Sequence, residues 1–276
     1  FFLLSEQFWQ RAIEISVGSL SPTINWKSIA KQEFFLPPKE EQAKLAKLLW
    51  AMNDAVEKKI QLFSKIEILY LSLIEKKMIN KSSKKTYFSS LGNVVRGVGF
   101  KPNDLLDVYD ENCCVILRAN NISNNKINYK DIKIISEEKV NNVQFMQEND
   151  FGICMSNGSK ELVGKAALFA RNSKNVSVGS FCAIFRPDNL QAVNILKHLF
   201  VSNSYRSSIK RILTGSAINN LKPSDIENLY LRVNFEGSGF DSLISNLNQL
   251  SDNKLQIENS IKDSKYLLRS LINQIF

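Results

Sequence analysis

Several loops in the middle of the chain are rich in side chains that can form hydrogen bonds with nucleic acid. Arg and Lys pair with phosphates, and Arg, Asn and Ser also reach base edges. Each residue alone is more typical of a turn or a solvated surface, so the prediction depends on the whole set. The candidate DNA-binding residues are Lys101, Arg118, Asn120, Asn121, Ser156, Asn157, Lys160, Lys165, Ser216, Asn219 and Lys222.

The positive charge of the chain is concentrated in the segment that carries these residues. The 276 residues have a net charge of +9. Residues 81–232 hold 21 Lys and Arg against 13 Asp and Glu, which is +8, whereas residues 1–80 contribute +2 and residues 233–276 contribute −1. A surface that binds the DNA backbone needs such an excess. Charge alone supports this weakly, but the charge and the polar loops together favour a DNA surface.

Residues that would support catalysis are missing from the sequence. The one histidine, His198, lies in an apolar stretch, which is typical of a packed helical residue and excludes paired histidines on zinc. Gly158-Ser159-Lys160 lacks the first glycine and the spacing of a P-loop. We therefore expect no catalytic residue, no metal site and no cofactor, and we do not expect the protein to be an enzyme.

The cysteines indicate a reducing compartment. Cys113 and Cys114 are adjacent, and neither Cys154 nor Cys182 belongs to a CxxC pair, which is more typical of cytosolic thiols than of disulfides or zinc ligands. No apolar run approaches the roughly 18 residues of a membrane-spanning helix. The apolar residues 1–4 are far too few for a secretory signal. We expect a cytoplasmic protein with no membrane partner.

The two ends of the chain match each other at a nearly constant offset. When the chain is shifted by 197 residues, Phe2-Leu3-Leu4-Ser5 meets Leu199-Phe200-Val201-Ser202, and Gly18-Ser19 meets Gly215-Ser216. After one added residue the match continues to the end of the chain. Two amphipathic helices can be aligned by chance, but chance does not explain the Gly-Ser pair and its flanking pattern. The repeat indicates one complete unit preceded by the end of another.

Each copy of the repeat ends in a predicted long helix. Pro37-Pro38-Lys39-Glu40-Glu41 is a helix start, and apolar residues then recur at spacings of four and three, with a polar break at Lys59. A helix of about 35 residues is roughly 50 Å long, so we expect the two helices to pack on each other rather than on their own domains. The predicted helix-pairing residues are Leu45, Leu49, Met52, Phe63, Ile66, Tyr70, Leu73, Leu243, Leu247, Leu250, Ile261, Leu268 and Leu271.

The segment between the helices changes to short β-like runs separated by Asn- and Gly-rich turns. The predicted fold class is mixed α/β: a globular domain with a β-sheet, flanked by two long antiparallel coiled-coil helices. The predicted β-like runs are Cys113–Leu117, Phe151–Met155, Ala166–Phe169 and Phe181–Phe185, followed by a helical stretch over Leu190–Leu213. The predicted divisions are 1–36, the end of another domain; 37–80, a long helix; 81–232, a complete domain; and 233–276, a second long helix.

Several short motifs occur in a fixed order along the chain, and one of them is the start of the first long helix. Together with the 197-residue period, this series resembles the DNA-specificity subunits of type I restriction–modification systems over nearly the whole chain. The second copy departs from the pattern, since Val233-Asn234-Phe235 replaces Leu-Pro-Pro. The motifs that carry the resemblance are Gly18-Ser19, Leu36-Pro37-Pro38, Glu41-Gln42, Leu117-Arg118-Ala119-Asn120-Asn121-Ile122 and Gly158-Ser159-Lys160-Glu161-Leu162-Val163-Gly164-Lys165.

The resemblance implies a subunit that catalyses nothing. In that family each target-recognition domain reads one half of a split site on double-stranded DNA, and the helices set the spacing and hold the methyltransferase (M) and restriction (R) subunits. Residues 86–232 would be a complete recognition domain. Residues 1–36 would be the end of a first recognition domain that is mostly absent.

Three other interpretations remain open. The chain can be a coiled-coil assembly module whose globular domain binds protein, which scattered rather than gathered basic charge would favour. It can also be a half-subunit that acts as a homodimer and so rebuilds a two-domain reader. The third interpretation is an enzyme, either a methyltransferase or a nuclease. In that case the purified chain alone would methylate or cleave DNA.

Overall fold

The computed structural model divides into two compact units. One unit, called here the helical unit, consists of Phe1–Leu69 with Gln249–Phe276, and the other, the globular unit, of Tyr70–Asn248. The domain boundaries expected after residues 36, 80 and 232 stay a prediction. The structure describes residues 1–123, 125–170, 175–214, 219–234 and 239–276.

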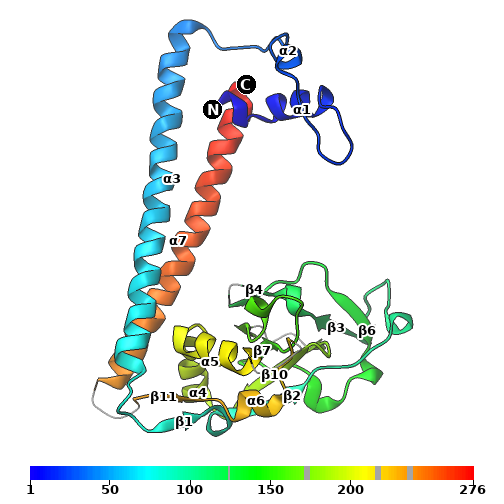
Figure 1. Cartoon of the computed structure of the whole chain (residues 1–276), viewed down its shortest axis with the longest axis vertical. Helices are drawn as coiled ribbons and strands as arrows, with labels where there is room; N and C mark the ends of the chain where they lie inside the picture. The colour runs from blue at the N-terminus through cyan, green and yellow to red at the C-terminus, as the bar shows by residue number, and fades with distance from the viewer. Residues whose placement is uncertain (124, 171–174, 215–218, 235–238) are drawn as a thin grey trace. The chain divides into compact units, whose positions relative to one another are not determined.

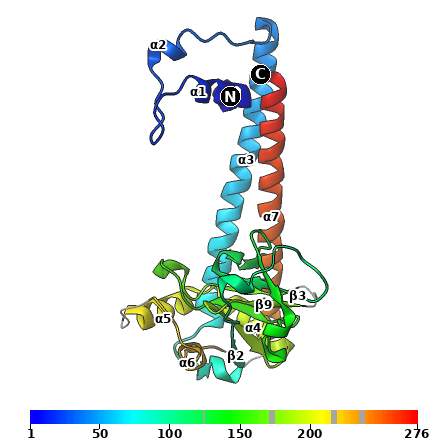
Figure 2. The same cartoon turned by 90° about the vertical axis from the view of Figure 1, so that its right-hand side faces the viewer.

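Two long helices form the helical unit and continue into the globular unit. Helix α3 spans Lys39–Leu73 and helix α7 spans Phe240–Ile275, which are 35 and 36 residues, and they lie side by side (Figures 1 and 2). They are antiparallel, because Lys59 of α3 bonds Ser264 of α7 while the later Glu67 bonds the earlier Lys254. The expected helix lengths agree with those observed.

An apolar core lies between the two helices. Leu49, Leu268 and Ile272 are buried together, and the ring of Phe63 lies 5.5 Å from the Lys254 ammonium. The periodic apolar residues of α3 and α7 are named here the seam. All of the predicted helix-pairing residues are buried or half-buried, namely Leu45, Leu49, Met52, Phe63, Ile66, Tyr70, Leu73, Leu243, Leu247, Leu250, Ile261, Leu268 and Leu271.

The seam is interrupted by a polar contact at the position where the sequence has Lys59. The Lys59 ammonium donates to the Ser260 hydroxyl at 2.8 Å and to the Ser264 hydroxyl at 2.7 Å. A lysine at a seam position reduces stability in return for a defined register. The hydroxyls of Ser260 and Ser264 keep this charge hydrogen-bonded inside the contact.

The first 38 residues contain two short α-helices, α1 at Glu6–Glu14 and α2 at Trp26–Ile29, and a 3₁₀ turn at Phe2–Leu4. The Ser5 hydroxyl caps α1 by accepting from the Phe8 amide at 3.2 Å, as expected for an N-cap serine. The Phe2 ring packs edge-on against Phe8, Phe34 and Phe276, with centroids 4.6–5.5 Å apart.

The globular unit contains two main sheets. The first is antiparallel, with the order β2-β10-β7-β8, and the second has the order β6-β3-β9, in which β3 and β9 are parallel. Two-stranded pairs β1-β11 and β4-β5 complete the unit. The strands are β1 Lys85–Tyr87, β2 Gly92–Arg96, β3 Cys113–Leu117, β4 Ile122–Ser123, β5 Lys126–Ile127, β6 Lys133–Ser136, β7 Phe151–Cys154, β8 Ala166–Leu168, β9 Val176–Val178, β10 Cys182–Pro187 and β11 Tyr230–Arg232.

Among the described residues, three α-helices accompany the sheets: α4 at Leu190–Leu199, α5 at Asn203–Thr214 and α6 at Pro223–Glu227. The helical stretch expected over 190–213 is therefore two helices separated by a short break. Around that break the buried rings of Phe200 and Tyr205 pack against Phe88 and against each other, with centroids 5.2–5.8 Å apart. Burying such aromatic rings dominates the stability of a small core. The predicted fold class, a mixed α/β globule with two long antiparallel helices, is confirmed.

Within the globular unit, which includes the last residues of α3 and the first residues of α7, these two helix ends form hydrogen bonds with α4 and α5. The Tyr70 hydroxyl lies 2.7 Å from Nδ1 of His198, and Oδ1 of Asn248 lies 2.9 Å from Nε2. After Leu73, a π-helical turn over Ile74–Met78 brings Glu75 to α5, where it accepts from the amide and the hydroxyl of Ser204.

Candidate nucleic-acid interface

Four loops of the globular unit converge on one cavity of about 590 Å³. The loops follow β2, β3, β7 and β9, and Lys133 of β6 adds to the wall. Four of the predicted DNA-binding residues line this cavity: Arg118, Asn120, Ser156 and Asn157. Sequence positions some 40 residues apart thus lie on one concave surface.

The cavity combines apolar walls with a polar rim. Phe100, Leu105 and Phe181 line it, and Phe181 is 69% exposed. Exposed aromatic faces stack well on nucleobases. The residues Phe100 and Phe181 were not predicted, because in the sequence they resemble ordinary core aromatics next to Gly99 and Ser180.

Backbone pairing behind the cavity fixes two of the four loops. The Gly97 amide donates to the Cys182 carbonyl at 3.2 Å, and the Val98 amide donates to the Val178 carbonyl at 2.7 Å. A Cβ atom on Gly97 would lie 2.2 Å from the Gly179 carbonyl oxygen, which no side chain tolerates. Glycine is therefore required where the loop after β2 meets the loop after β9.

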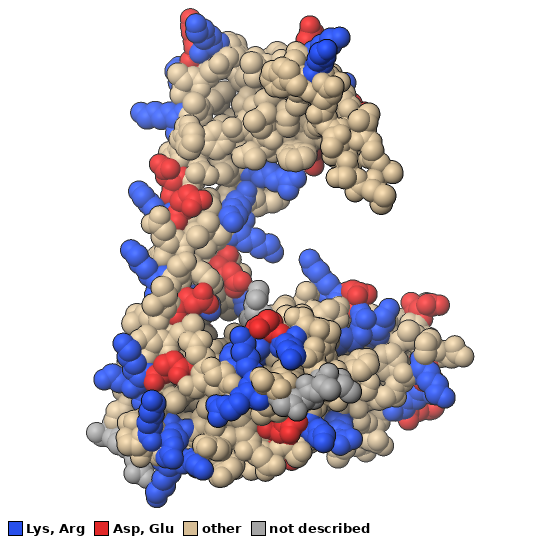
Figure 3. Space-filling view, viewed as in Figure 1, with Lys and Arg blue, Asp and Glu red and all other residues tan. Residues whose placement is uncertain are grey.

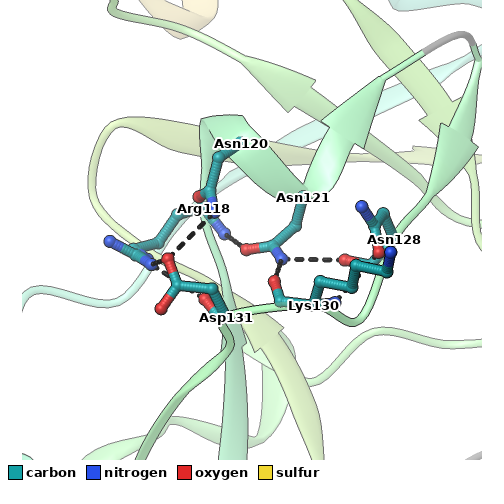
Figure 4. A network of polar contacts seen from close by, with 6 residues as sticks. All are labelled: Arg118, Asn120, Asn121, Asn128, Lys130 and Asp131. Carbon is teal, nitrogen blue, oxygen red and sulfur yellow. Dashed lines mark hydrogen bonds and ion pairs between the residues drawn. The ribbon is translucent and has the colours of Figure 1, made fainter. Parts of the chain in front are cut away.

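The loop after β3 is closed by Asn121, which is fully buried. Its side-chain oxygen accepts from the Arg118 amide, and its NH₂ group donates to the carbonyls of Asn128 and Lys130, each at 2.8 Å (Figure 4). Every polar atom of the Asn121 side chain is therefore hydrogen-bonded within the protein. The prediction that Asn121 contacts DNA is therefore corrected: the residue holds the loop in shape.

The side chain of Arg118 is held by Asp131. Its Nη2 donates to the carboxylate and to the carbonyl of Asp131, both at 2.8 Å (Figure 4). Asp131 has a φ of +50°, in the left-handed region that aspartate adopts more readily than most residues. The exposed Asn120 lies 3.5 Å from the same carboxylate. No sequence signal distinguished Asp131 from other loop acids, because its partner is 13 residues away.

Ser156 and Asn157 are tied to the segment at 219–220. Ser156 forms an antiparallel bridge with Asn220, and the Asn219 side chain donates to the Gly158 carbonyl at 3.0 Å. The predicted residue Asn219 thus supports the loop that lines the cavity. Ser216, which was predicted beside it, lies outside the described residues.

The predicted lysines lie in more open positions. Lys101 follows the cavity residue Phe100 and is exposed, as are Lys160 and Lys222, whereas Lys165 is half-buried. Flexible, exposed ammonium groups suit phosphates better than bases.

The basic charge of the globular unit is not gathered into one patch on the face shown in Figure 3. Lys and Arg side chains occur at several places there, with Asp and Glu among them. Ion pairs account for some of this mixing, for example Lys139 with Asp104 at 2.9 Å and Lys210 with Glu161 at 3.3 Å. The cavity and its loops therefore define the candidate interface better than the charge does.

The four cysteines are free and buried. Burial raises the pKa of the Cys114 thiol to about 12 and also raises the pKa of Cys182, which lines the cavity. Such thiols are weak nucleophiles at neutral pH. Within the described ranges, no cluster of His, Cys, Asp or Glu has the arrangement of a metal site. In the same part of the chain, no helix combines the length and the apolarity needed to cross a bilayer.

Solved structures of type I specificity (S) subunits share this fold. The S subunit of M. genitalium aligns with a TM-score of 0.60 at 14% identity, covering 97% of this chain and 69% of that one. The HsdS subunit of Thermoanaerobacter tengcongensis aligns at 0.53 and 14% identity over 100% of this chain and 68% of that one. A chain from a study of complex assembly in the type I R-M system aligns at 0.60 and 13% identity, covering 98% and 68%. The fold is that of the type I S subunits.

Two curated proteins are related in sequence. The StySPI specificity subunit of Salmonella potsdam is 34% identical over 139 residues, and the EcoKI specificity subunit of Escherichia coli K12 is 32% identical over 139 residues. The match covers 50% of this chain but only 30% of each relative. No family model matches the chain. The predicted resemblance to type I specificity subunits is confirmed by these relatives and by the solved structures.

Proposed function

We propose that this chain is a non-catalytic specificity subunit of a type I restriction–modification enzyme, acting in the cytoplasm. Residues 86–232 read one half-site of double-stranded DNA, and the two long helices hold the methyltransferase and restriction subunits. The observation that carries the proposal is the S-subunit fold over 97–100% of the chain, together with relatives of that name.

The loops around the cavity supply the DNA-reading surface in this proposal. They present Arg, Asn and Ser side chains from a rigid sheet, which is the arrangement that recognition loops need. The exposed Lys101 and Lys160 supply phosphate contacts. The absence of a catalytic constellation in the sequence agrees with a subunit that directs chemistry performed by others.

The outer face of α3 supplies a surface for a partner. Leu48, Leu62 and Leu69 are each close to half exposed, at 48–49%, and they are separated by multiples of seven residues. In the helical unit they form one stripe beside the seam, because residues seven apart lie on one side of a helix. An apolar stripe of this kind suits another helix, here one from a methyltransferase subunit.

Co-purification followed by methylation mapping tests the proposal. The chain should co-purify with the host's type I methyltransferase subunit, and the complex should methylate a restricted set of sites. Leu62→Asp on the stripe should reduce co-purification tenfold or more, while Val108→Asp at an exposed position of the globular unit leaves it unchanged. Equal affinity of the complex for every duplex sequence would contradict the proposal.

The scattered charge in Figure 3 favours one other candidate, a coiled-coil assembly module whose globular domain binds protein. The two functions differ in salt dependence. A DNA reader loses affinity for duplex DNA steeply with salt because bound phosphates release counterions. A protein-binding module shows no duplex binding that depends on sequence.

A further inference from the structure

We infer that Arg118 recognises a guanine, and that Asp131 positions Arg118 for this contact. This inference rests on the proposed DNA-reading function and assigns one side chain and one base to it. The juxtaposition that carries it is an arginine at the cavity rim with one part of its guanidinium bound by a carboxylate and another part left open.

The main chain at Arg118 is rigid. Arg118 directly follows β3, whose five residues are all buried, and its amide donates to the buried Asn121 side chain at 2.8 Å. A base-reading side chain needs such a support, because a displacement of about 1 Å is enough to lose its geometry.

The hydrogen bonds of the guanidinium are distributed unequally. Nη2 is bound twice by Asp131, and Nε is buried with no hydrogen-bond partner among the described residues. The other terminal nitrogen points away from Asp131 (Figure 4), and the side chain as a whole is 34% exposed. The open terminal nitrogen carries two N–H donors, and Arg118 is the one arginine among the described residues that line the cavity.

The chemistry of this open group favours a base over a phosphate. Pairing with Asp131 offsets much of the positive charge, which weakens attraction to a phosphate, but it leaves the direction of the free donors unchanged. Guanine presents two neighbouring acceptors, O6 and N7, in the major groove, whereas cytosine presents a donor there and adenine a donor beside an acceptor. The two N–H bonds of one nitrogen diverge, so this group gives one hydrogen bond, to O6 or to N7. Guanine, with acceptors at both positions, fits such a donor better than the other bases, since thymine offers only O4.

Asp131 acts here as a positioning residue. Its side chain is 71% exposed, so an aspartate at this position contributes little to the packing of the core. Its carboxylate accepts a hydrogen bond from Arg118 and makes a weak contact with Asn120. Without the negative charge, Arg118 would move more freely and carry its full charge. Binding would then become stronger for any duplex and less selective.

Selection from randomised duplexes tests the inference with the full chain in complex with its methyltransferase subunit. Wild type first defines the preferred bases. Arg118→Ala and Arg118→Lys should both lose the preference for guanine at one position, on the order of 10- to 100-fold, with other positions unchanged. Asp131→Asn should bind non-cognate duplexes at least as well as wild type while discriminating less at that same position.

Control variants separate this effect from folding and from nonspecific charge. Arg11 forms an exposed ion pair with Glu14 at 3.4 Å in the helical unit, so Arg11→Ala matches the loss of charge and should leave every preference unchanged. Thermal unfolding of each variant checks its fold, and Arg118→Lys keeps the charge at the site.

Three outcomes would overturn the inference. One is an unchanged guanine preference in Arg118→Ala, and another is a uniform loss of affinity, which identifies a phosphate contact. The third, Asp131→Asn behaving as wild type, removes the positioning role. If wild type itself has no sequence preference, the proposed function fails, which is a distinguishable result.

Discussion

His198 is a buried imidazole with a hydrogen-bond partner on each ring nitrogen. Since the Asn248 side-chain oxygen can only accept, Nε2 carries the proton, and Nδ1 accepts from the Tyr70 hydroxyl. Burial lowers the pKa of His198 to about 4, and the neighbouring charge of Lys197 adds to the shift, while the Asn248 bond opposes it. The neutral ring therefore joins α3, α4 and α7 at physiological pH.

This arrangement predicts a pH dependence of stability. The unfolded chain binds a proton at His198 below about pH 6.5, whereas the folded chain does so only near pH 4. The free energy of unfolding should therefore be fully retained above pH 6.5 and fall by up to about 1.4 kcal/mol per pH unit between those values. Urea unfolding at pH 7, 5.5 and 4.5 measures it. In His198→Gln this part of the slope should vanish, and an equal slope in both proteins would contradict the assignment.

Asn121 and Asn120 are neighbours with opposite roles, which gives a matched pair of variants. Asn121→Ala leaves a buried amide and two carbonyls unpaired and should reduce the free energy of unfolding by about 1–3 kcal/mol. Asn120→Ala, at an exposed position, should change it by less than about 0.5 kcal/mol. Thermal unfolding of the two variants decides the matter. Similar losses would show that the Asn121 bonds are unimportant.

At the scale of elements, the long helices were the most predictable part of the chain. Their period of four and three, and the start signal at Pro37-Pro38, predicted a long helix over residues 37–80, and the observed α3 begins two residues later, at Lys39. Four strands were also expected within a residue or two, since their apolar runs are continuous. The other strands were missed. Those of two to four residues carry too little pattern to separate a strand from a loop, namely β1, β4, β5, β6, β9 and β11. The five-residue β2, Gly92–Arg96, was also missed.

The seam predicts a sharp contrast between adjacent leucines on α3. Leu49 is 2% exposed and packs in the core with Leu268, whereas Leu48 is 48% exposed. Leu49→Ala should lower the free energy of unfolding by about 2–5 kcal/mol, and Leu48→Ala should have a small effect.

Protein concentration distinguishes pairing within one chain from pairing between two chains. With the seam buried inside one chain, the melting temperature of Leu49→Ala should not change over a hundredfold range of concentration. A melting temperature that rises with concentration would instead support the homodimer.

At the scale of the whole molecule, the residues predicted in the polar loops have two different roles. Some line the cavity, and others form hydrogen bonds that hold the loops in shape. Arg118, Asn120, Ser156 and Asn157 reach the cavity, while Asn121 and Asn219 bond the loops themselves. Residue type does not separate these roles, because an asparagine amide satisfies a loop carbonyl as well as a base. Burial decides between them, and burial depends on strands that are distant in the sequence.

The exposed lysines predict the salt dependence of duplex binding. If Lys101 and Lys160 each contact one phosphate, replacing either with alanine should reduce the slope of log affinity against log salt by about one, with base preferences unchanged. Binding isotherms at four salt concentrations measure the slope. A changed base preference in either variant would show that the lysine reads sequence.

The pairing of β1 with β11 has a consequence for how the protein is made. Lys85 is the register partner of Arg232, and on α3 the side chain of Leu49 has its core partners at Leu268 and Ile272. The ribosome adds about 5–20 residues per second. Arg232, Leu268 and Ile272 are therefore made on the order of ten seconds after Lys85 and Leu49, the residues that they pack against. During synthesis the apolar residues of α3 and of the first strands stay exposed to solvent until the later segments are made. A nascent chain arrested before β11 should therefore remain sensitive to protease and bind chaperones.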